Sequence, residues 1–276
     1  MWLLVYQLKT PQQLALMRRA GLVVWQALKS ACKHVQPGVT TAQLNQVIEQ
    51  VFQRYGAEPV FKNRPGRVPF PAASCISINE ELIHGIPGPR RIQPGDLVTL
   101  DTGCRLQGWC ADAAVSVGVP PLRPHLARLL QVAQQTLQQA IDAIPRASTW
   151  GAVVQQMATF VRRQGFGLVE EFVGHGIGRQ LHEKPDVPHH PAHLARTRAD
   201  FPLEPGLVIA VEPMITLGRT AVHTRADHWT VVTADGLPAV HVEHTVAVTP
   251  QGGWVLTGPP NPEEKCWLQH AASPGT

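Results

Sequence analysis

Apolar residues recur at helical spacing along four stretches of the chain, and each stretch predicts an amphipathic helix. The first begins after Thr10, where a hydroxyl N-cap, a following proline and Gln13 supply the groups of a helix start. The second is expected at about residues 41–55, with apolar side chains at every third or fourth position. The same periodicity predicts helices near residues 126–141 and 153–161.

Shorter runs of β-branched and apolar residues between and after these helices predict strands. Residues 97–100 and 109–119 flank a turn-rich segment, which indicates a hairpin. Further strands are expected at residues 75–78, 207–213, 230–233 and 241–248. Residues 57–73, with four prolines, and a glycine- and histidine-rich segment from Gly174 are predicted as loops.

The chain also resembles itself at a nearly constant offset. The segment from Pro94 to Asp101, a Pro-Gly turn followed by an apolar run and an acid, recurs from Pro205 to Glu212, 111 residues later. The predicted helix that ends before Gly56 has a counterpart 109 residues later. This repetition predicts two similar α+β halves that each place an acid in a shared cleft, with chance similarity of the segments as the alternative.

Composition excludes several classes of protein. The 276 residues are 44% hydrophobic and 16% charged, which argues against a disordered, collagen-like or coiled-coil chain. The net charge is +4 and no Lys/Arg block exceeds two residues, so we expect no nucleic-acid or membrane partner. Five cysteines without C-x-x-C spacing, no membrane-length apolar stretch and no signal-peptide pattern favour a cytoplasmic protein.

Four carboxylates interrupt apolar, strand-like runs, where acids are disfavoured unless a cation lies between them. Asp101 and Asp112 lie on the two arms of the predicted hairpin. A turn centred at residues 106–107 would place them directly opposite each other, and a slip of one or two residues would leave them diagonal. Glu212 and Glu243 occupy comparable positions in the second half. An exposed acid is the alternative for each one singly, but a poor explanation for all four.

Electrostatics favours two divalent ions over one for such a cluster. Two like charges about 4 Å apart repel by about 4 kcal/mol at an effective dielectric constant near 20. One divalent ion would leave four carboxylates with a net negative charge, whereas two would neutralise them. Adding an imidazole ligand favours manganese, iron, cobalt or zinc over calcium.

The imidazole would come from one of 13 histidines. We choose His175 because the glycines on both sides would let the backbone approach an ion. His84 starts a His-Gly-Ile sequence that matches the one at His175, so a second imidazole is expected in the cleft. The zincin pattern H-E-x-x-H fails at His182. The histidines set among prolines in a polar stretch are expected to be solvated: His189, His190 and His193.

Taken in order, these residues resemble the type I methionine aminopeptidases, over residues 9–249. The motifs are Ser77-Ile78-Asn79-Glu80, His84-Gly85-Ile86-Pro87, Gly174-His175-Gly176-Ile177-Gly178-Arg179, His182-Glu183, Val211-Glu212-Pro213-Met214 and Val242-Glu243-His244-Thr245. The interval between His182 and Glu212 lacks the long insertion of type II relatives. The resemblance implies an α+β pita-bread fold, with two pseudo-symmetric halves around a central curved sheet.

The resemblance also implies the metal ligands and the catalytic residues. Two divalent ions (cobalt, manganese, iron or zinc) would be held by Asp101, Asp112, His175, Glu212 and Glu243. Asp112 and Glu243 would bridge the ions, Asp101 would bind one of them, and His175 and Glu212 the other. Catalysis would use a water activated between the ions, with Glu212 as general base and with His84 and His182 in contact with substrate.

A pocket for the methionine side chain is implied at Phe70, Cys75, Leu181 and Trp229. An ordinary buried thiol at Cys75 and a core aromatic residue at Trp229 are the alternatives. The departures from the family concentrate here. Residues 64–71 read Arg-Pro-Gly-Arg-Val-Pro-Phe-Pro where relatives have an aromatic, glycine-rich loop. Leu181 stands in place of an aromatic residue, and His241 in place of glutamine.

The expected protein is a monomeric cytoplasmic aminopeptidase that acts on peptide and nascent-chain N-termini with a small second residue, with a transient ribosome contact. We expect an N-terminal segment at residues 1–9, a single catalytic domain at residues 10–250, and a flexible C-terminal tail at residues 251–276. Two alternatives remain: an aminopeptidase of the same fold with altered specificity, including X-Pro bonds, or a catalytically inactive binding protein.

Overall fold

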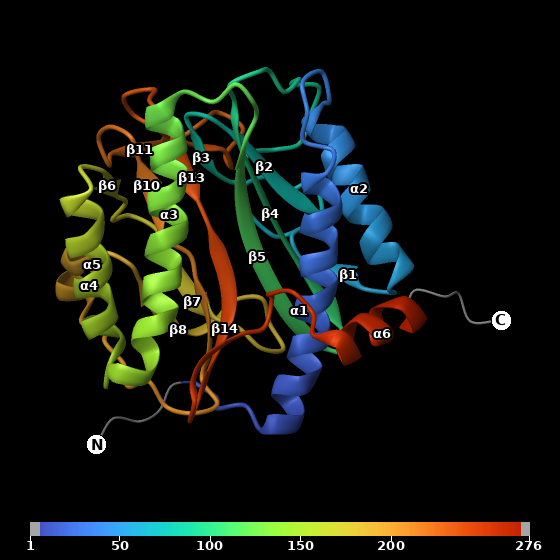
Figure 1. Ribbon diagram of the computed structural model, residues 1–276, viewed down its shortest axis with the longest axis vertical. Helices are drawn as coiled ribbons and strands as arrows, with labels where there is room; N and C mark the ends of the chain where they lie inside the picture. Colours follow the sequence, from blue (N-terminus) through green and yellow to red (C-terminus); the bar gives the residue numbers. More distant parts are fainter. Residues whose placement is uncertain (1–5, 272–276) are drawn as a thin grey trace.

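The computed structural model describes residues 6–271, and an antiparallel nine-stranded sheet forms its centre (Figure 1). Its main path follows the order β1-β4-β5-β14-β9-β7-β8, with β2 paired to β4 and β15 to β14. The strands are β1 (Glu58–Pro59), β2 (Ser74–Ile78), β4 (Leu97–Leu106), β5 (Trp109–Gly118), β7 (Val173–Gly176), β8 (Glu183–Pro188), β9 (Val208–Val211), β14 (Glu243–Thr249) and β15 (Gly252–Val255). Two three-stranded sheets accompany it, β6 (Gly167–Leu168) with β10 (Met214–Thr216) and β13 (Ala239–His241), and β3 (Glu81–Ile83) with β11 (Val222–Thr224) and β12 (Val231–Thr233).

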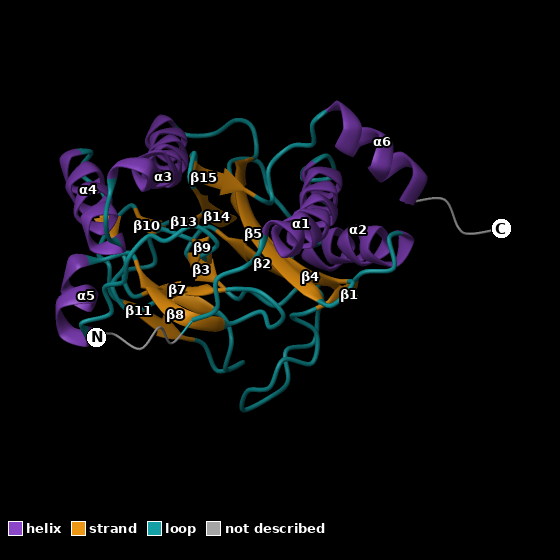
Figure 2. Cartoon of the chain, turned by 90° about the horizontal axis from the view of Figure 1, so that it is seen from below, coloured by secondary structure: helices purple, strands orange, loops and turns teal. Residues whose placement is uncertain are grey.

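Helices pack against this sheet in two pairs, one for each half of the chain (Figure 2). They are α1 (Pro11–Cys32), α2 (Thr41–Arg54), α3 (Pro124–Ala143), α4 (Trp150–Arg163), the shorter α5 (Pro191–Thr197) and α6 (Pro262–Ala271), and a 3-10 helix, η1 (Ile144–Arg146). The first pair shares a core with β4 and β5, and the second with β9 and β14. The four predicted helices are therefore confirmed. Among residues 6–271, no helix combines the length and the apolar character that a membrane span requires.

The starts of the first two helices follow from local sequence. Thr10 and Gln13 form the predicted capping box, in which Gln13 N–H donates to Thr10 Oγ1 (3.3 Å) and Thr10 N–H donates to Gln13 Oε1 (2.9 Å). Thr40 and Gln43 repeat the arrangement before α2. Each box satisfies two amides that the helical hydrogen-bond pattern leaves unpaired.

Alternation along the strands decides which side chains reach the helices and which reach the opposite face of the sheet. On β4, Val98 and Leu100 pack into the core with α1 and α2, so Asp101 points the other way. On β14, Val246 packs with α3 and α4, so Glu243, three residues earlier, also points away from the helices. One acid from each half therefore reaches the same side of the sheet.

The internal repeat is present in the backbone. Gly95 and Gly206 both have positive φ angles, 89° and 96°, and a strand begins two residues after each of them. Gly56 and Gly165, which follow the ends of α2 and α4, also have positive φ, 63° and 80°. Since glycine adopts this conformation without steric cost, the repeated sequence encodes the same turn in each half.

The β4–β5 hairpin differs from the predicted register by two residues. The turn is Gln107-Gly108, with φ angles of 51° and 79°, and not a pair centred at residues 106–107. A two-residue hairpin turn of this type requires positive φ at both positions, which the glycine satisfies most readily. Asp101 therefore pairs with Ala114, and Asp112 lies diagonally across from Asp101, as predicted for a slipped turn.

The segment predicted as a loop from Gly174 is instead part of the sheet. His175 lies on β7, which pairs with both β8 and β9. The flanking glycines serve this pairing rather than access for an ion, because a Cβ on Gly174 would clash with the carbonyl oxygen of Ala210 and one on Gly176 with that of Lys184. Strand packing therefore fixes the backbone on both sides of His175.

The tail after residue 250 differs from the flexible segment expected, because it has regular structure up to Ala271. β15 extends the central sheet, and α6 contacts α1 through Arg18, a buried residue of α1. The Arg18 guanidinium donates to both carboxylate oxygens of Glu264 and to four backbone carbonyls between residues 255 and 259. Apolar periodicity could not reveal this contact, because its partners are 246 residues apart and polar.

Replacing Arg18 with alanine should lower the free energy of unfolding by about 2–3 kcal/mol, because Glu264 and buried carbonyls would lose their donor. Urea denaturation followed by circular dichroism measures this change. Arg54→Ala, at an exposed position at the end of α2, is the control and should change stability by less than about 0.5 kcal/mol. Equal stability of the two variants would mean that the Arg18 contacts do not hold the tail.

Candidate metal centre

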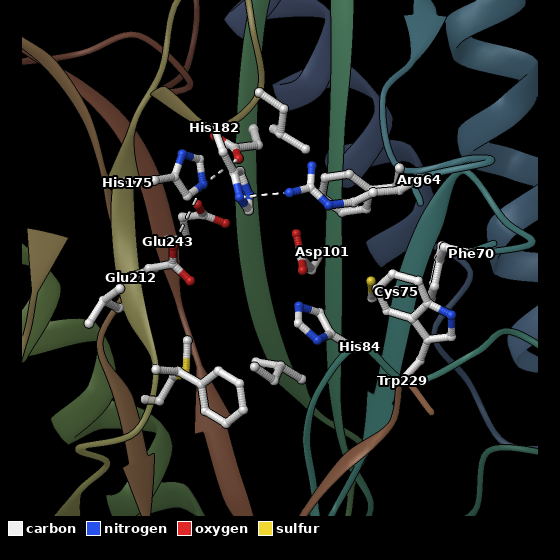
Figure 3. Close-up of a pocket in the computed structure, with 17 residues that line it drawn as sticks. Arg64, Phe70, Cys75, His84, Asp101, His175, His182, Glu212, Trp229 and Glu243 are labelled. Carbon is white, nitrogen blue, oxygen red and sulfur yellow. Dashed lines mark hydrogen bonds and ion pairs between the residues drawn. The ribbon is translucent and has the colours of Figure 1, made fainter. Parts of the chain in front are cut away.

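A cavity of about 260 Å³ lies where acidic side chains from both halves meet (Figure 3). Every residue that the sequence predicted for the site lines it. The predicted polar residues are His84, Asp101, Asp112, His175, His182, Glu212 and Glu243. The predicted apolar residues are Phe70, Cys75, Leu181 and Trp229. In Figure 3, Phe70, Cys75 and Trp229 lie on the side of the cavity opposite His175, Glu212 and Glu243.

The five predicted metal ligands come from five different strands or strand ends. Asp101 is on β4, Asp112 on β5 and His175 on β7, whereas Glu212 directly follows β9 and Glu243 begins β14. All five are at most 8% exposed. Adjacent strands of one sheet therefore bring together residues that lie more than a hundred positions apart in sequence.

Three of these residues already form a compact donor set. Ligand atoms of Asp112, His175 and Glu243 lie within 4.8 Å of one another. His175 Nε2 is 3.3 Å from Asp112 Oδ2 and 3.7 Å from Glu212 Oε1. Asp101 lines the same cavity, but its Oδ1 is buried without a hydrogen-bond partner in the described residues. An unpartnered buried carboxylate oxygen beside this donor set fits a bound cation.

The backbone orients the His175 ring as a ligand requires. Nδ1 lies 3.0 Å from the carbonyl oxygen of Gly176, to which it can donate a proton. In the neutral ring Nε2 then carries the lone pair, and it points into the carboxylate cluster. Imidazoles that bind metals commonly have this second hydrogen bond, which fixes the tautomer and the ring orientation.

Burial and mutual repulsion favour protonation of the cluster when no cation balances it. Desolvation, with a contribution from Asp112 and Glu212, raises the pKa of Asp101 to about 7. Desolvation and the neighbouring carboxylates also raise the pKa of Glu243 well above its usual value. Burial alone would lower the pKa of His175, but the Asp112 carboxylate outweighs it and raises the pKa to about 9. These shifts indicate a site that favours positive charge, and its oxygen and nitrogen donors fit a divalent ion.

Two neutral imidazoles face the cluster. Burial lowers the pKa of His84 to about 4 and that of His182 to about 3. The His182 ring lies 3.9 Å from that of His175, between centroids, and its Nδ1 accepts a hydrogen bond from Arg64 Nη2 at 2.7 Å. The proton of neutral His182 is therefore on Nε2, where it can be donated to a bound molecule.

The apolar part of the cavity is built around two aromatic rings. Phe70 and Trp229 pack edge to face, with ring centroids 5.2 Å apart, and the loop before β2 holds Trp229 through a hydrogen bond from Nε1 to Val68 O (2.7 Å). Desolvation raises the pKa of the Cys75 thiol well above its usual value, so Cys75 is a neutral part of the wall. Leu181, which precedes His182 in the chain, also lines the cavity.

Three residues near the site were not predicted to act there. His189 was expected to be solvated but is 2% exposed, and its Nε2 accepts a hydrogen bond from Glu212 N–H (3.0 Å). His241 Nε2 lies 3.4 Å from Glu212 Oε2, and Arg64 reaches into the cavity from the proline-rich loop. The sequence held one signal, because Arg64 and His241 both lie at positions where the chain departs from its family. His189 gave none, since the packing of Trp150 against its ring encloses it.

Comparison with known proteins agrees with this geometry. Residues 15–250 match metallopeptidase family M24. The chain is 38% identical to methionine aminopeptidase 1 of Bacillus subtilis over 249 residues, which cover 90% of this chain and 98% of that protein. It superposes on the crystal structure of methionine aminopeptidase from Thermotoga maritima with a TM-score of 0.85 and 33% identity, covering 92% of this chain and 99% of the other.

A prolidase from Pyrococcus furiosus shares the fold at a TM-score of 0.73 and 20% identity, with 92% of this chain and 66% of that chain covered. These neighbours confirm the predicted α+β pita-bread fold. The internal repeat corresponds to the two halves of this fold, since each half contributes strands to one curved sheet and helices that pack against it.

Proposed function

This chain belongs to metallopeptidase family M24 and is a peptide hydrolase, and we propose that it is a methionine aminopeptidase acting on N-termini with a small second residue. The observation that carries the proposal is a single cavity that combines a buried carboxylate and imidazole cluster with an apolar pocket. The cluster suits metal-dependent hydrolysis, and the pocket suits an unbranched apolar side chain. The substrates of this protein would be the N-termini of peptides and nascent chains in the cytoplasm. The protein would be a monomer with a transient ribosome contact.

The cavity would hold two divalent ions, chosen among cobalt, manganese, iron and zinc. Asp101, Asp112, His175, Glu212 and Glu243 would hold them. When bound, such ions lower the pKa of water and polarise the scissile carbonyl. Four carboxylates support two ions because a single one would leave the buried site negatively charged.

The remaining steps fall to side chains of the chain itself. Glu212 would accept the proton of the attacking water and pass it to the leaving amine. Its position is held by the hydrogen bond from its N–H to His189 and by the contact with His241. His182 would donate from Nε2 to the substrate carbonyl, and His84 would hydrogen-bond the peptide nitrogen.

No observation favours the two alternative functions. The likeness to prolidase, at 20% identity, supports the shared fold alone, and this chain covers only 66% of that protein. A metal-free binding protein would be favoured by the loss of a ligand, yet all five positions hold side chains that can bind a metal. Methionine aminopeptidase is therefore the function to test first.

The test compares Met-Ala-Ser with Ala-Pro-Ser as substrates in the presence of manganese, cobalt or iron. We expect release of methionine from the first peptide at least about tenfold faster than release of alanine from the second, because the Phe70 and Trp229 rings form an apolar pocket. Amino-acid analysis, or coupled oxidation of the released amino acid, measures the rates of both reactions. Faster cleavage of Ala-Pro-Ser would favour an X-Pro peptidase, and failure to cleave either peptide with any metal would favour the binding protein.

A further inference from the structure

A second cavity of about 360 Å³ adjoins the first one. The two share three lining residues, Arg64, Leu181 and His182, which lie where the cavities meet. His182 therefore has the metal-ligand cluster on one side and this second cavity on the other. No step of the proposed hydrolysis uses the second cavity, and its lining includes the cations Lys62, Arg64 and Arg105.

Of these three cations, Arg64 alone has no carboxylate partner within 4 Å in the part of the chain that the structure describes. Lys62 Nζ pairs with Glu49 at 3.1 Å, and Arg105 pairs with Glu58 at 3.2 Å. Arg64 Nη2 donates a hydrogen bond to Nδ1 of His182, an imidazole that burial keeps neutral. The Arg64 guanidinium is half-buried and has five N–H donors, so several remain for a ligand besides the one given to His182.

The loop that carries Arg64 is closed on itself and fastened to the site. Backbone hydrogen bonds join Asn63 N–H to Phe70 O (2.8 Å) and Phe70 N–H to Arg64 O (3.0 Å). Trp229 donates to Val68 O within the same loop, and a Cβ on Gly66 would lie 2.6 Å from the Trp229 ring. These contacts hold the Arg64 backbone in place before any ligand binds, which reduces the entropic cost of binding.

We propose that the second cavity receives the peptide beyond the scissile bond, and that Arg64 binds a carboxylate there, within one or two residues of that bond. This inference rests on the proposed function, because it places the scissile bond beside His182. Arg64 Nη2 is 2.7 Å from His182 Nδ1, and an extended peptide advances only about 3.3–3.6 Å per residue. The carboxylate is either the C-terminus of a short peptide or an acidic side chain, and a guanidinium can bind both in the same way.

The experiment uses two pairs of peptides that differ only in that carboxylate. Met-Ala-Gly is compared with its C-terminal amide, and Met-Ala-Asp amide with Met-Ala-Asn amide. For at least one pair we expect kcat/KM to be roughly tenfold to a hundredfold higher for the carboxylate form, mainly through KM, as a charge-assisted hydrogen bond would give. The pair that shows the effect identifies the source of the carboxylate.

Arg64→Gln removes the charge but keeps an amide donor, and should reduce the preference to within about twofold. Arg67→Gln is the matched control, since Arg67 is exposed on the same loop and lines neither cavity, and it should keep the full preference. A preference that survives Arg64→Gln would overturn the proposal. So would an equal loss for all four peptides, because Arg64 would then act only by positioning His182.

Calorimetric binding of the leaving dipeptides gives a readout that does not depend on turnover. Ala-Gly is compared with its C-terminal amide, and Ala-Asp amide with Ala-Asn amide. The wild-type protein should bind the carboxylate form of the pair that shows the kinetic effect more tightly, and Arg64→Gln should remove this preference. Equal binding of the carboxylate and neutral forms would contradict the proposal even if methionine is released. Absence of cleavage together with this preference would contradict only the proposed function.

Discussion

Chelation of divalent metal should abolish methionine release and also lower the melting temperature of the protein. The activity should fall by at least about a thousandfold, because the cluster around Asp112, His175 and Glu243 offers no other means to generate a nucleophile from water at neutral pH. Activity should return on addition of manganese, cobalt or iron. Release of methionine from Met-Ala-Ser and thermal unfolding are measured on the same samples.

The change in melting temperature separates a metal centre from a merely acidic pocket. A ligand present at about 100 times its dissociation constant stabilises the folded state by about 2.7 kcal/mol. The buried carboxylates add to this effect, since without metal Asp101 and Glu243 must either stay charged in a desolvated site or take up protons. Asp112→Asn should reduce the metal-dependent shift, because Asp112 belongs to the compact donor set. Activity that persists in the metal-free protein would contradict the proposed centre.

Glu212→Gln should lower kcat by about a thousandfold while leaving the fold intact. Glutamine keeps an oxygen that can face a metal ion, but it cannot accept a proton, and loss of a general base typically costs a factor of about 100 to 10,000. The Glu212 backbone bond to His189 does not depend on the side chain, so the local structure should be retained. Steady-state kinetics, metal content and circular dichroism are measured together.

Glu263→Gln is the matched control for Glu212→Gln. Glu263 is exposed at the start of α6 and lines no part of the cavity, so its variant should keep full activity. Near-normal turnover in Glu212→Gln would remove Glu212 from the proton transfer. Loss of bound metal in that variant would instead show that Glu212 acts mainly as a ligand.

Local sequence was a reliable guide wherever short-range physics decides the structure. The capping box at Thr10, the apolar periodicity of the four long helices and the Pro-Gly turns at Gly95 and Gly206 are encoded within a few residues, and each was confirmed. The hairpin register was wrong by two residues because the prediction placed the turn before Gly108. Asp101 and Asp112 still lie on the same face of the hairpin, as diagonal neighbours, since side chains two residues apart on a strand share a face.

Contacts between distant segments could not be predicted in the same way. Burial of His189 depends on Trp150 and on the strand that precedes Glu212, and the ordered tail depends on Arg18. Arg64 belongs to a loop that departs from the family, but its approach to His182 spans 118 residues. In each case the partners are polar or far apart in the sequence, so neither secondary-structure propensity nor the spacing of apolar residues predicts the contact.

The amino-acid sequence by itself therefore determined the elements, the repeat of two halves and the identity of the acids and imidazoles that gather at the centre. Only the tertiary structure decided how close those groups lie, which of them lack a hydrogen-bond partner among residues 6–271, and that Arg64 lies where two cavities meet. The physical reason is the range of the forces involved. Backbone hydrogen bonds and side-chain periodicity act within a few residues, whereas desolvation and charge interaction depend on distances that exist only once the sheet has formed.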